Sequence, residues 1–414
     1  MNIKSLLLGS AAALVAVSGA RAADVIVPLA PEPADYVRVC DVYGAGFYYI
    51  PGTETCMKIG GYVRFQYNVA GPIEDDYDGD FLINEEGDDY QTGSAVRVRL
   101  NFDVREETEL GTLRAYARLQ AQNTFGAYSN DADYRMDMGY IQLGGLTMGY
   151  LDSLWTEGDG LLTDTDLPVG DYQTNRVSYT YAADGFSAAL SLEDDATGDF
   201  APDVVGRLAF EGGWGSVYLA GSYDESQRAG LLDDFFYDPA LGIPGFGLEG
   251  FDTGYDDGSF ALKAGLSLKD LVATDSELKI EGSYAFDPSS YSTIGLFSNA
   301  GTLGRDIDSV VGTVPVEWQI GAGYAQSFGK LGFAIAGVYG ETFDFTSYDA
   351  LGRGFDAGSG DYYKLVGNVG YEITNNFDML AEVSYTNLDL DGGEVFLDDS
   401  IDQTAGFLRF VRSF

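Results

Sequence analysis

The sequence predicts an all-β fold that spans a membrane: a sixteen-stranded antiparallel β-barrel with short turns at one end and long loops at the other. Polar and apolar residues alternate in about sixteen segments, each close to the ten residues that a tilted strand needs to cross a bilayer. Such alternation suits strands with one face in lipid and one in water. After residue 22 there is no run of about 20 apolar residues, so no helical span is predicted.

The composition agrees with a barrel and excludes several functions. The 414 residues include 55 Gly, 29 Tyr and 25 Phe, and the formal net charge is −42. This charge argues against nucleic-acid binding and favours attraction of cations. There is no histidine, which removes histidine-dependent catalysis and histidine metal sites. No motif places Lys, Asp or Glu as catalysts either, so we do not expect an enzyme.

Residues 1–22 have the features of a secretory signal peptide. Lys4 supplies the positive charge, residues 6–17 the apolar core, and Ala20-Arg21-Ala22 a small-x-small cleavage site. The mature chain is then expected to begin near Ala23, in an oxidising compartment.

Residues 23–56 are predicted to form a periplasmic N-terminal segment. Its two cysteines, Cys40 and Cys56, are the only ones in the chain. In an exported protein they most simply form one disulfide, and two free buried thiols are the alternative. A Pro-Gly turn at Pro51 predicts a small hairpin that the disulfide would fix just before the first long strand.

Residues 57–414 are predicted to form the barrel. The expected strands are 57–69, 94–105, 112–122, 133–143, 145–155, 175–183, 185–193, 203–211, 215–224, 258–269, 276–286, 316–327, 331–343, 361–373, 376–387 and 403–414. The links between them alternate between short and long, and the long ones are acidic. An even strand number returns both ends to the short-turn side, so the turns are periplasmic and the loops external. In segment 134–143 the phase of the alternation is ambiguous.

The strands 94–105 and 112–122 carry arginines on their polar faces. Pairing about the link 106–111 places Arg99 opposite Arg118. Like charges directly opposite destabilise a sheet pair, so acidic groups or water must face them. The alternative, a solvated face of a soluble sheet, does not explain the apolar companion faces of so many strands.

The last strand ends on Phe414, with Phe410 and Leu408 in the same phase. A terminal aromatic residue on an amphipathic strand resembles the C-terminal assembly signal of outer-membrane proteins. The barrel-assembly machinery is therefore an expected partner. Arg412 departs from the usual pattern, in which a hydrophobic residue stands, and would extend toward the membrane surface.

The segment from Tyr36 to Tyr67, YVRVCDVYGAGFYYIPGTETCMKIGGYVRFQY, resembles the start of the alphaproteobacterial general porins. The terminal FLRFVRSF and the strand layout agree with this resemblance, whereas loops 225–257 and 287–315 contain no matching motif. It implies a homotrimeric, water-filled diffusion pore in the outer membrane of a Gram-negative bacterium. It also implies that the third external loop, here 156–174, folds into the barrel and narrows it.

An acidic loop facing a basic wall would create a transverse field at this constriction. The expected loop acids are Glu157, Asp159, Asp164, Asp166 and Asp171. The expected basic wall consists of Arg64, Arg97, Arg99, Arg114, Arg118 and Arg135. The alternative is that the arginines are hydrated wall residues and the loop lies outside.

The leading functional hypothesis is passive diffusion of small hydrophilic solutes and ions. The alternatives are a barrel that anchors or adheres through its acidic external loops, and an outer-membrane hydrolase. No cofactor is expected, although the acidic loops could hold Ca²⁺ or Mg²⁺ loosely and bridge to lipopolysaccharide phosphates. The stretch 387–398 matches half of an EF-hand loop, but its place between strands favours a hairpin tip.

Overall fold

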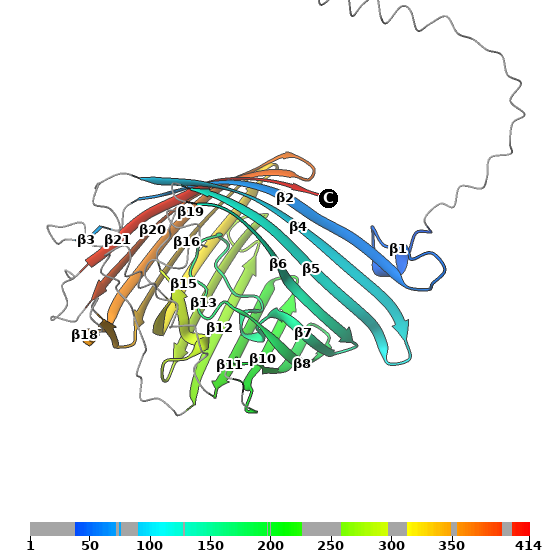
Figure 1. Ribbon diagram of the computed structural model, residues 1–414, viewed down its shortest axis with the longest axis horizontal. Coiled ribbons are helices and arrows are strands. Elements are labelled where there is room, and N and C mark those ends of the chain that lie inside the picture. The colour runs from blue at the N-terminus through cyan, green and yellow to red at the C-terminus, as the bar shows by residue number, and fades with distance from the viewer. Residues whose placement is uncertain are drawn as a thin grey trace, which may run out of the picture. The chain divides into compact units, whose positions relative to one another are not determined.

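The computed structural model describes residues 38–71, 74–75, 90–126, 129–196, 198, 200–225, 258–296, 313–348, 354–390 and 400–414. Within them, sixteen antiparallel strands form a barrel (Figure 1). They are β2 (Cys56–Ala70), β4 (Gln91–Thr108), β5 (Gly111–Gly126), β6 (Ser129–Leu143), β7 (Leu146–Asp152), β8 (Gln173–Ala183), β9 (Phe186–Glu193), β10 (Asp203–Gly212), β11 (Gly215–Asp224), β12 (Ser259–Lys269), β13 (Ser276–Ala285), β15 (Thr313–Phe328), β16 (Leu331–Thr342), β19 (Gly360–Thr374), β20 (Phe377–Leu390) and β21 (Ser400–Ser413). The predicted signal peptide, most of the acidic first loop and most of loops 225–257 and 287–315 lie outside the described residues.

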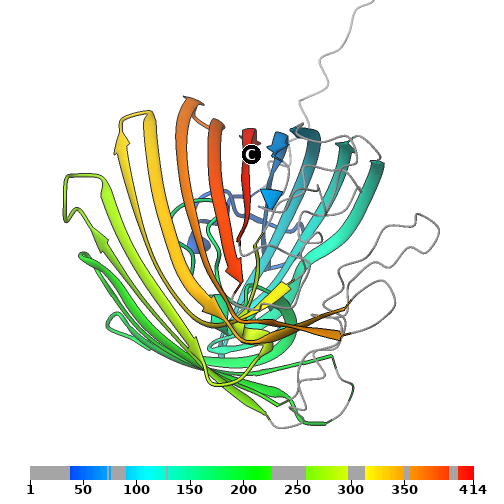
Figure 2. The same cartoon turned by 90° about the vertical axis from the view of Figure 1, so that its left-hand side faces the viewer.

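The barrel closes where its first strand meets its last. Arg64 of β2 lies opposite Arg97 of β4 on one side and opposite Val411 of β21 on the other. Figure 2 shows this closure, with the red C-terminal strand beside the blue first strand. Closure leaves no unpaired sheet edge, which a membrane requires of strands. The predicted sixteen-stranded barrel is confirmed.

The two faces of the strands differ as the alternation predicts. Outward side chains such as Leu190, Leu365 and Val383 are each 56% exposed, and they would contact lipid. Inward neighbours such as Ser191 and Glu382 are buried. The alternation therefore indicates that the outer face of the sheet contacts lipid.

The turn between β4 and β5 corrects the predicted register. Thr108 pairs with Gly111, so the link has two residues instead of six. As a result Arg99 faces Gln120, and Arg118 faces Asn101. The predicted opposition of Arg99 and Arg118 is wrong, because both strands continue into the charged segment that the sequence analysis assigned to the link.

The N-terminal hairpin has the predicted disulfide. Strand β1 (Tyr48–Tyr49) pairs with the start of β2, and Cys40 is bonded to Cys56, with their Cα atoms 6.1 Å apart. The 3₁₀ helix η1 (Asp41–Tyr43) lies between them in sequence. The guanidinium of Arg105 on β4 stacks over the Phe47 ring at 5.2 Å, which fixes the hairpin to the periplasmic end of the barrel.

Replacing both cysteines with serine is expected to loosen this hairpin and leave the barrel folded. The disulfide spans 16 residues, and closing such a loop contributes roughly 3 kcal/mol in the chain-entropy model. The barrel itself depends on its closed strand ladder. Limited proteolysis should cut the variant within residues 40–56 faster than the parent. Loss of the heat-sensitive barrel band on an unheated gel would contradict this expectation.

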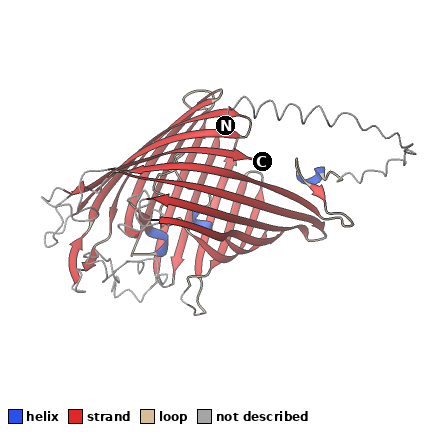
Figure 3. Cartoon of the chain, turned by 45° about the horizontal axis from the view of Figure 1, so that its top comes forward, coloured by secondary structure: helices blue, strands red, loops and turns tan. Residues whose placement is uncertain are grey.

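The remaining elements are short. Strand β3 (Glu74–Asp75) pairs with β21, β14 (Thr293–Gly295) pairs with β15, and β17 (Phe345–Tyr348) pairs with β18 (Gly354–Gly358). Two more 3₁₀ helices, η2 (Leu154–Thr156) and η3 (Ser290–Ser292), complete the described chain (Figure 3). Over the described residues, no helix has the length and apolar character needed to cross a membrane.

The apolar core lies inside the barrel. Residues 153–172, between β7 and β8, contribute Leu161, Leu167 and Val169 to it. The rest of this cluster comes from the inner face of β14 to β16, β19 and β20, and from the segments flanking them: Ile294, Leu296, Val314, Val316, Ala336, Val338, Tyr362, Val366 and Leu388. This part of the inner wall therefore carries a cluster of apolar side chains beside polar ones such as Gln319 and Lys364, which corrects the expectation of a polar inner face throughout.

Candidate functional site

The segment 153–172, here called the inner loop, leaves the strand wall earlier than predicted. Strand β7 ends at Asp152, and Ser153 caps the helix η2 by accepting from the Trp155 backbone N–H. Trp155 is the last residue of the predicted strand 145–155. It is fully buried in the barrel interior, and its indole N–H donates to the carbonyl of Val169 at 2.8 Å.

Lys263 of β12 holds both arms of the inner loop. Its Nζ lies 3.1 Å from Asp159 Oδ2 and donates to the Val169 carbonyl at 2.9 Å. The same ammonium lies 4.7 Å from the centre of the Trp155 ring. Lys279 of β13 donates to the Asp159 carbonyl at 2.7 Å. A buried charge is tolerated only when it is paired in this way, so Lys263 acts as an anchor.

Two glycines of β15 make the seat of the inner loop. A Cβ on Gly323 would lie 1.7 Å from the Leu161 carbonyl oxygen, and a Cβ on Gly321 would lie 2.4 Å from Leu161 Cδ1. Gln319, on the same strand, donates to the Leu167 carbonyl at 2.7 Å. The loop therefore rests directly on the backbone of this strand.

The tip of the inner loop contacts the neighbouring strands β20 and β21 through Asp164. The Asp164 backbone N–H donates to Glu382 Oε2 at 2.9 Å, and its carboxylate forms a bidentate pair with the Arg409 guanidinium. Arg409 also donates to Gln66 Oε1 at 2.7 Å. Arg409 was not among the predicted wall arginines, because the last strand was interpreted only as an assembly signal.

The predicted arginines line the inner face of β2, β4, β5 and β6. Arg64 and Arg97 lie directly opposite each other, and no ion pair within 4 Å joins either of them to a carboxylate of the described chain. Arg97 Nε donates to Gln122 Oε1 at 2.5 Å, and Arg99 Nη2 to Gln120 Oε1 at 2.8 Å. The predicted arginines of these four strands are together called the arginine wall.

A β-bulge supplies the acid that the crowded arginines need. Arg118 pairs with Met138 and the next residue, Leu119, pairs with Met136, so Asp137 is the extra residue of β6. Asp137 is 5% exposed. Its carboxylate lies 3.2 Å from Arg99, 3.3 Å from Arg118 and 4.0 Å from Arg135. The bulge re-aims this side chain, which explains the ambiguous phase of segment 134–143.

A second acid of the wall, Asp103, pairs with the arginines near the periplasmic end of the barrel. Asp103 accepts from both Arg105 and Arg114, at 2.7–3.0 Å. Arg105 and Arg114 face each other three pairs from the turn, so Arg114 lies near the periplasmic end of the wall. The carboxylates that form ion pairs with most of the wall arginines therefore belong to strands and not to the inner loop.

The five predicted loop acids divide among several roles. Asp164 pairs with Arg409 of β21, and Asp159 pairs with Lys263 instead. Asp166 accepts from the backbone N–H of Leu161 within the loop. Glu157 and Asp171 are exposed. One predicted acid, Asp164, thus pairs with an arginine of the inner wall, and that arginine was not among those predicted.

Burial raises the pKa of the Asp166 carboxyl from 3.8 to about 6, and the nearby Glu281 and Glu382 add to the rise, while the Leu161 N–H opposes it. Between about pH 6 and 3.8 the seated loop therefore holds a proton that the unfolded chain does not. Linkage then makes the seated loop more stable as pH falls through 6, and less stable above it.

We therefore expect amide hydrogen exchange in residues 159–169 to be slower at pH 5 than at pH 7.5, after correction for the intrinsic pH dependence of exchange. Asp166→Asn, which keeps the shape and stays neutral, should remove the difference. The same pH dependence in Asp166→Asn as in the parent would show that another group is responsible.

A closed antiparallel barrel with an apolar exterior and a loop seated on its inner wall defines an outer-membrane channel-type barrel. The chain belongs to the porin subfamily, whose family description matches residues 24–404. It is a protein of the Gram-negative outer membrane. The resemblance to alphaproteobacterial porins is thereby confirmed.

Individual relatives agree with this family. The chain is 43% identical over 257 residues to Porin Omp2b of Brucella canis, a match that covers 54% of this chain and 66% of that protein, slightly under two thirds of its length. It is 42% identical over 262 residues to Porin Omp2a of Brucella ovis, covering 54% and 71%. The outer membrane channel DcaP of Acinetobacter baumannii has a similar fold, with TM-score 0.57, 16% identity and coverage of 88% and 99%.

Proposed function

We propose that the protein forms a water-filled channel for passive diffusion of small hydrophilic solutes and ions across the outer membrane. The observation that carries the proposal is the position of the inner loop. Lys263 of β12 and Gly323 of β15 hold it against the inner wall, and its tip is bonded to Arg409 of β21. A barrel that only anchors has no use for a loop fixed in this way.

The constriction is the region between the loop tip and the arginine wall. Its basic side consists of Arg64, Arg97, Arg99, Arg118 and Arg409, and its acidic side has Asp164 at its centre. Charges of opposite sign on facing walls orient dipolar solutes and separate the paths of cations and anions. Arg114 extends the basic surface toward the periplasm, and Arg135 lies in the same row as Arg99, with Gln120 of β5 between them.

Membership of the porin subfamily indicates a channel rather than an enzyme. An anchoring or adhesive barrel remains a second candidate, and it would act through external loops outside the described residues. The two are distinguished by conduction, because an anchor does not need to pass ions.

Assembly as a homotrimer is part of the proposal, supported by the resemblance of the N- and C-terminal motifs to general porins. Phe414 and Leu408 lie outward on the last strand, 59% and 39% exposed, where the assembly machinery would meet them. Lipopolysaccharide, and loosely bound Ca²⁺ or Mg²⁺ at the external loops, are further proposed partners. An unheated gel should show heat-sensitive oligomers.

The direct test is single-channel recording in a planar bilayer with the folded protein. Stepwise, long-lived conductance increases in potassium chloride are expected, and heat-denatured protein serves as the control. Folded, membrane-inserted protein that gives no conductance steps would reject the channel and favour the anchor.

A further inference from the structure

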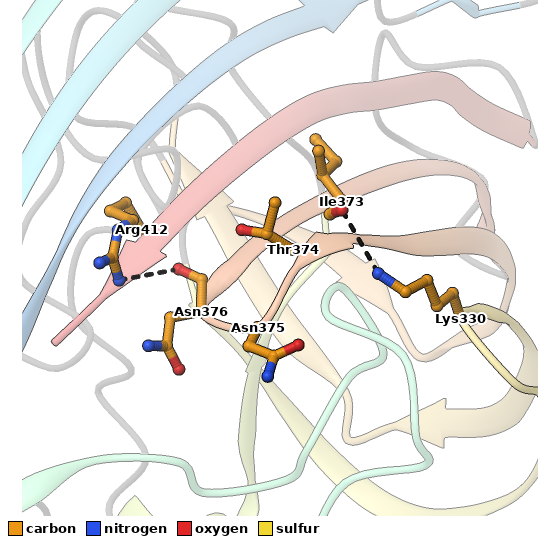
Figure 4. A pocket seen from close by; sticks show the side chains of 6 residues that line it. All are labelled: Lys330, Ile373, Thr374, Asn375, Asn376 and Arg412. Atoms are coloured by element: carbon orange, nitrogen blue, oxygen red, sulfur yellow. Dashed lines mark hydrogen bonds between the residues drawn. The ribbon is translucent and has the colours of Figure 1, made fainter.

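A basic pocket of about 410 Å³ lies at the periplasmic rim of the barrel. Figure 4 shows the side chains around it, from two hairpin turns and the end of β21. Lys330 belongs to the turn between β15 and β16, and Arg412 lies two residues from the C-terminus. The remaining lining residues, from the end of β19 and the turn to β20, are Ile373, Thr374, Asn375 and Asn376.

Neither cation of this pocket has an acidic partner within 4 Å in the described chain, although acids outnumber bases 65 to 23. Lys330 Nζ donates to the Ile373 carbonyl at 3.4 Å, and Arg412 Nη1 to the Asn376 carbonyl at 3.3 Å and to the Ser413 carbonyl. Both bonds to the turns are long. A guanidinium has five N–H donors, so most of the Arg412 donors remain available to a ligand.

The nearby acids lie on the other face of the sheet. Glu372 and Asp378 oppose each other, one position from the pair Tyr371 and Met379. Tyr371 is 43% exposed on the outer face, so the alternation of the strands turns Glu372 and Asp378 toward the lumen.

Arg412 itself lies on the lipid side. It stands opposite Val63 and Phe377, and Val63 is 43% exposed on the outer face. Just inside the membrane, the Phe377 and Phe410 rings stack 6.2 Å apart. A long basic side chain above an aromatic surface reaches the level of lipid headgroups.

We propose that this pocket binds the headgroup phosphate of an anionic phospholipid in the periplasmic leaflet. Lys330 and Arg412 would bind the phosphate from two sides, with the Asn375 and Asn376 amides close by, and an acyl chain would lie along Phe377 and Phe410. The apolar surface that continues from the pocket favours a lipid over a free anion. This site is separate from the channel and does not depend on it.

The test is native mass spectrometry of the folded, delipidated protein titrated with phosphatidylglycerol. Removing both cations in Lys330→Ala/Arg412→Ala should weaken binding about 30-fold, since each cation near a membrane surface contributes on the order of 1 kcal/mol. Lys269→Ala, which removes an exposed lysine at the end of β12, is the matched control and should bind as the parent does. Equal binding by the parent and the double variant would overturn the proposal.

Two further arms keep the result unambiguous. Because Arg412 belongs to the expected assembly signal, Lys330→Ala alone and Arg412→Lys are measured as well, with folding checked by the heat-sensitive gel band. Lys330→Ala should weaken binding about fivefold by the same reasoning. Unchanged lipid binding in this folded variant would count against the site. Inorganic phosphate at millimolar concentration should not displace the lipid, and full displacement would identify a free-anion site instead.

Discussion

Replacing Lys263 with methionine is expected to release the inner loop and raise single-channel conductance. The Lys263 side chain is fully buried, and it binds Asp159 and the Val169 carbonyl at once. Removing one partner of a buried ion pair typically costs roughly 3–5 kcal/mol. Methionine keeps most of the side-chain volume, so the substitution destabilises the attachment of the loop and not the packing of β12. A loop that leaves its seat no longer holds Asp164 at a fixed height in the channel.

A second substitution tests the same point without changing charge. Valine at Gly323 would place atoms where the Leu161 backbone lies, because even a Cβ there would be 1.7 Å from the Leu161 carbonyl oxygen. Gly367→Ala is the matched control, since its Cβ would meet only Ile335 Cγ2 at 4.0 Å. Both Lys263→Met and Gly323→Val should raise conductance and speed hydrogen exchange in residues 159–169. Unchanged conductance in both would show that the loop does not set the narrowest point.

The strands could be predicted because lipid on one face and water on the other impose a period of two. The register was harder to predict. It depends on turn length, and the charged residues Glu106 and Glu107 continue as strand beyond the membrane instead of forming the link. Composition alone does not distinguish a polar turn from a polar strand end. The predicted partner of Arg99 was therefore two residues away from the observed partner, Gln120.

The carboxylates that pair with the arginines could not be predicted, for a different reason. A bulge at Asp137 moves one side chain to the other face, and the sequence shows only an unclear phase at that point. The pair of Asp164 with Arg409 joins residues 245 positions apart, and such contacts follow from barrel closure. No local pattern contains them.

The seat of the inner loop did leave a signal in the sequence. In β16 both faces are apolar: Ile335 faces outward and 57% exposed, whereas Ala334 and Ala336 face inward and buried. A strand next to a water-filled lumen would carry polar residues inward. Apolar residues on both faces therefore indicate that something covers the inner face, as Leu161 and Leu167 do.

Ion selectivity is expected to respond in opposite directions to changes on the two sides of the constriction. The charge of −42 enriches cations at the mouth, but the Debye length is about 10 Å at 0.1 M salt. Distant loop charges are therefore screened, whereas charges at the constriction are not. The parent should show modest selectivity that leans to cations at low salt.

Arg64→Ala/Arg97→Ala should strengthen cation preference most, because these two cations have no acid partner within 4 Å in the described chain. Arg99→Ala/Arg118→Ala should act in the same direction and in addition leave Asp137 without its two nearest partners. Asp164→Asn should shift preference toward anions, because it frees Arg409. The measurement is the reversal potential under a salt gradient, with Lys269→Ala as the control far from the constriction. If the three variants and the parent agree within error, neither group lines the narrowest part of the channel, and the selectivity filter must be sought in the external loops.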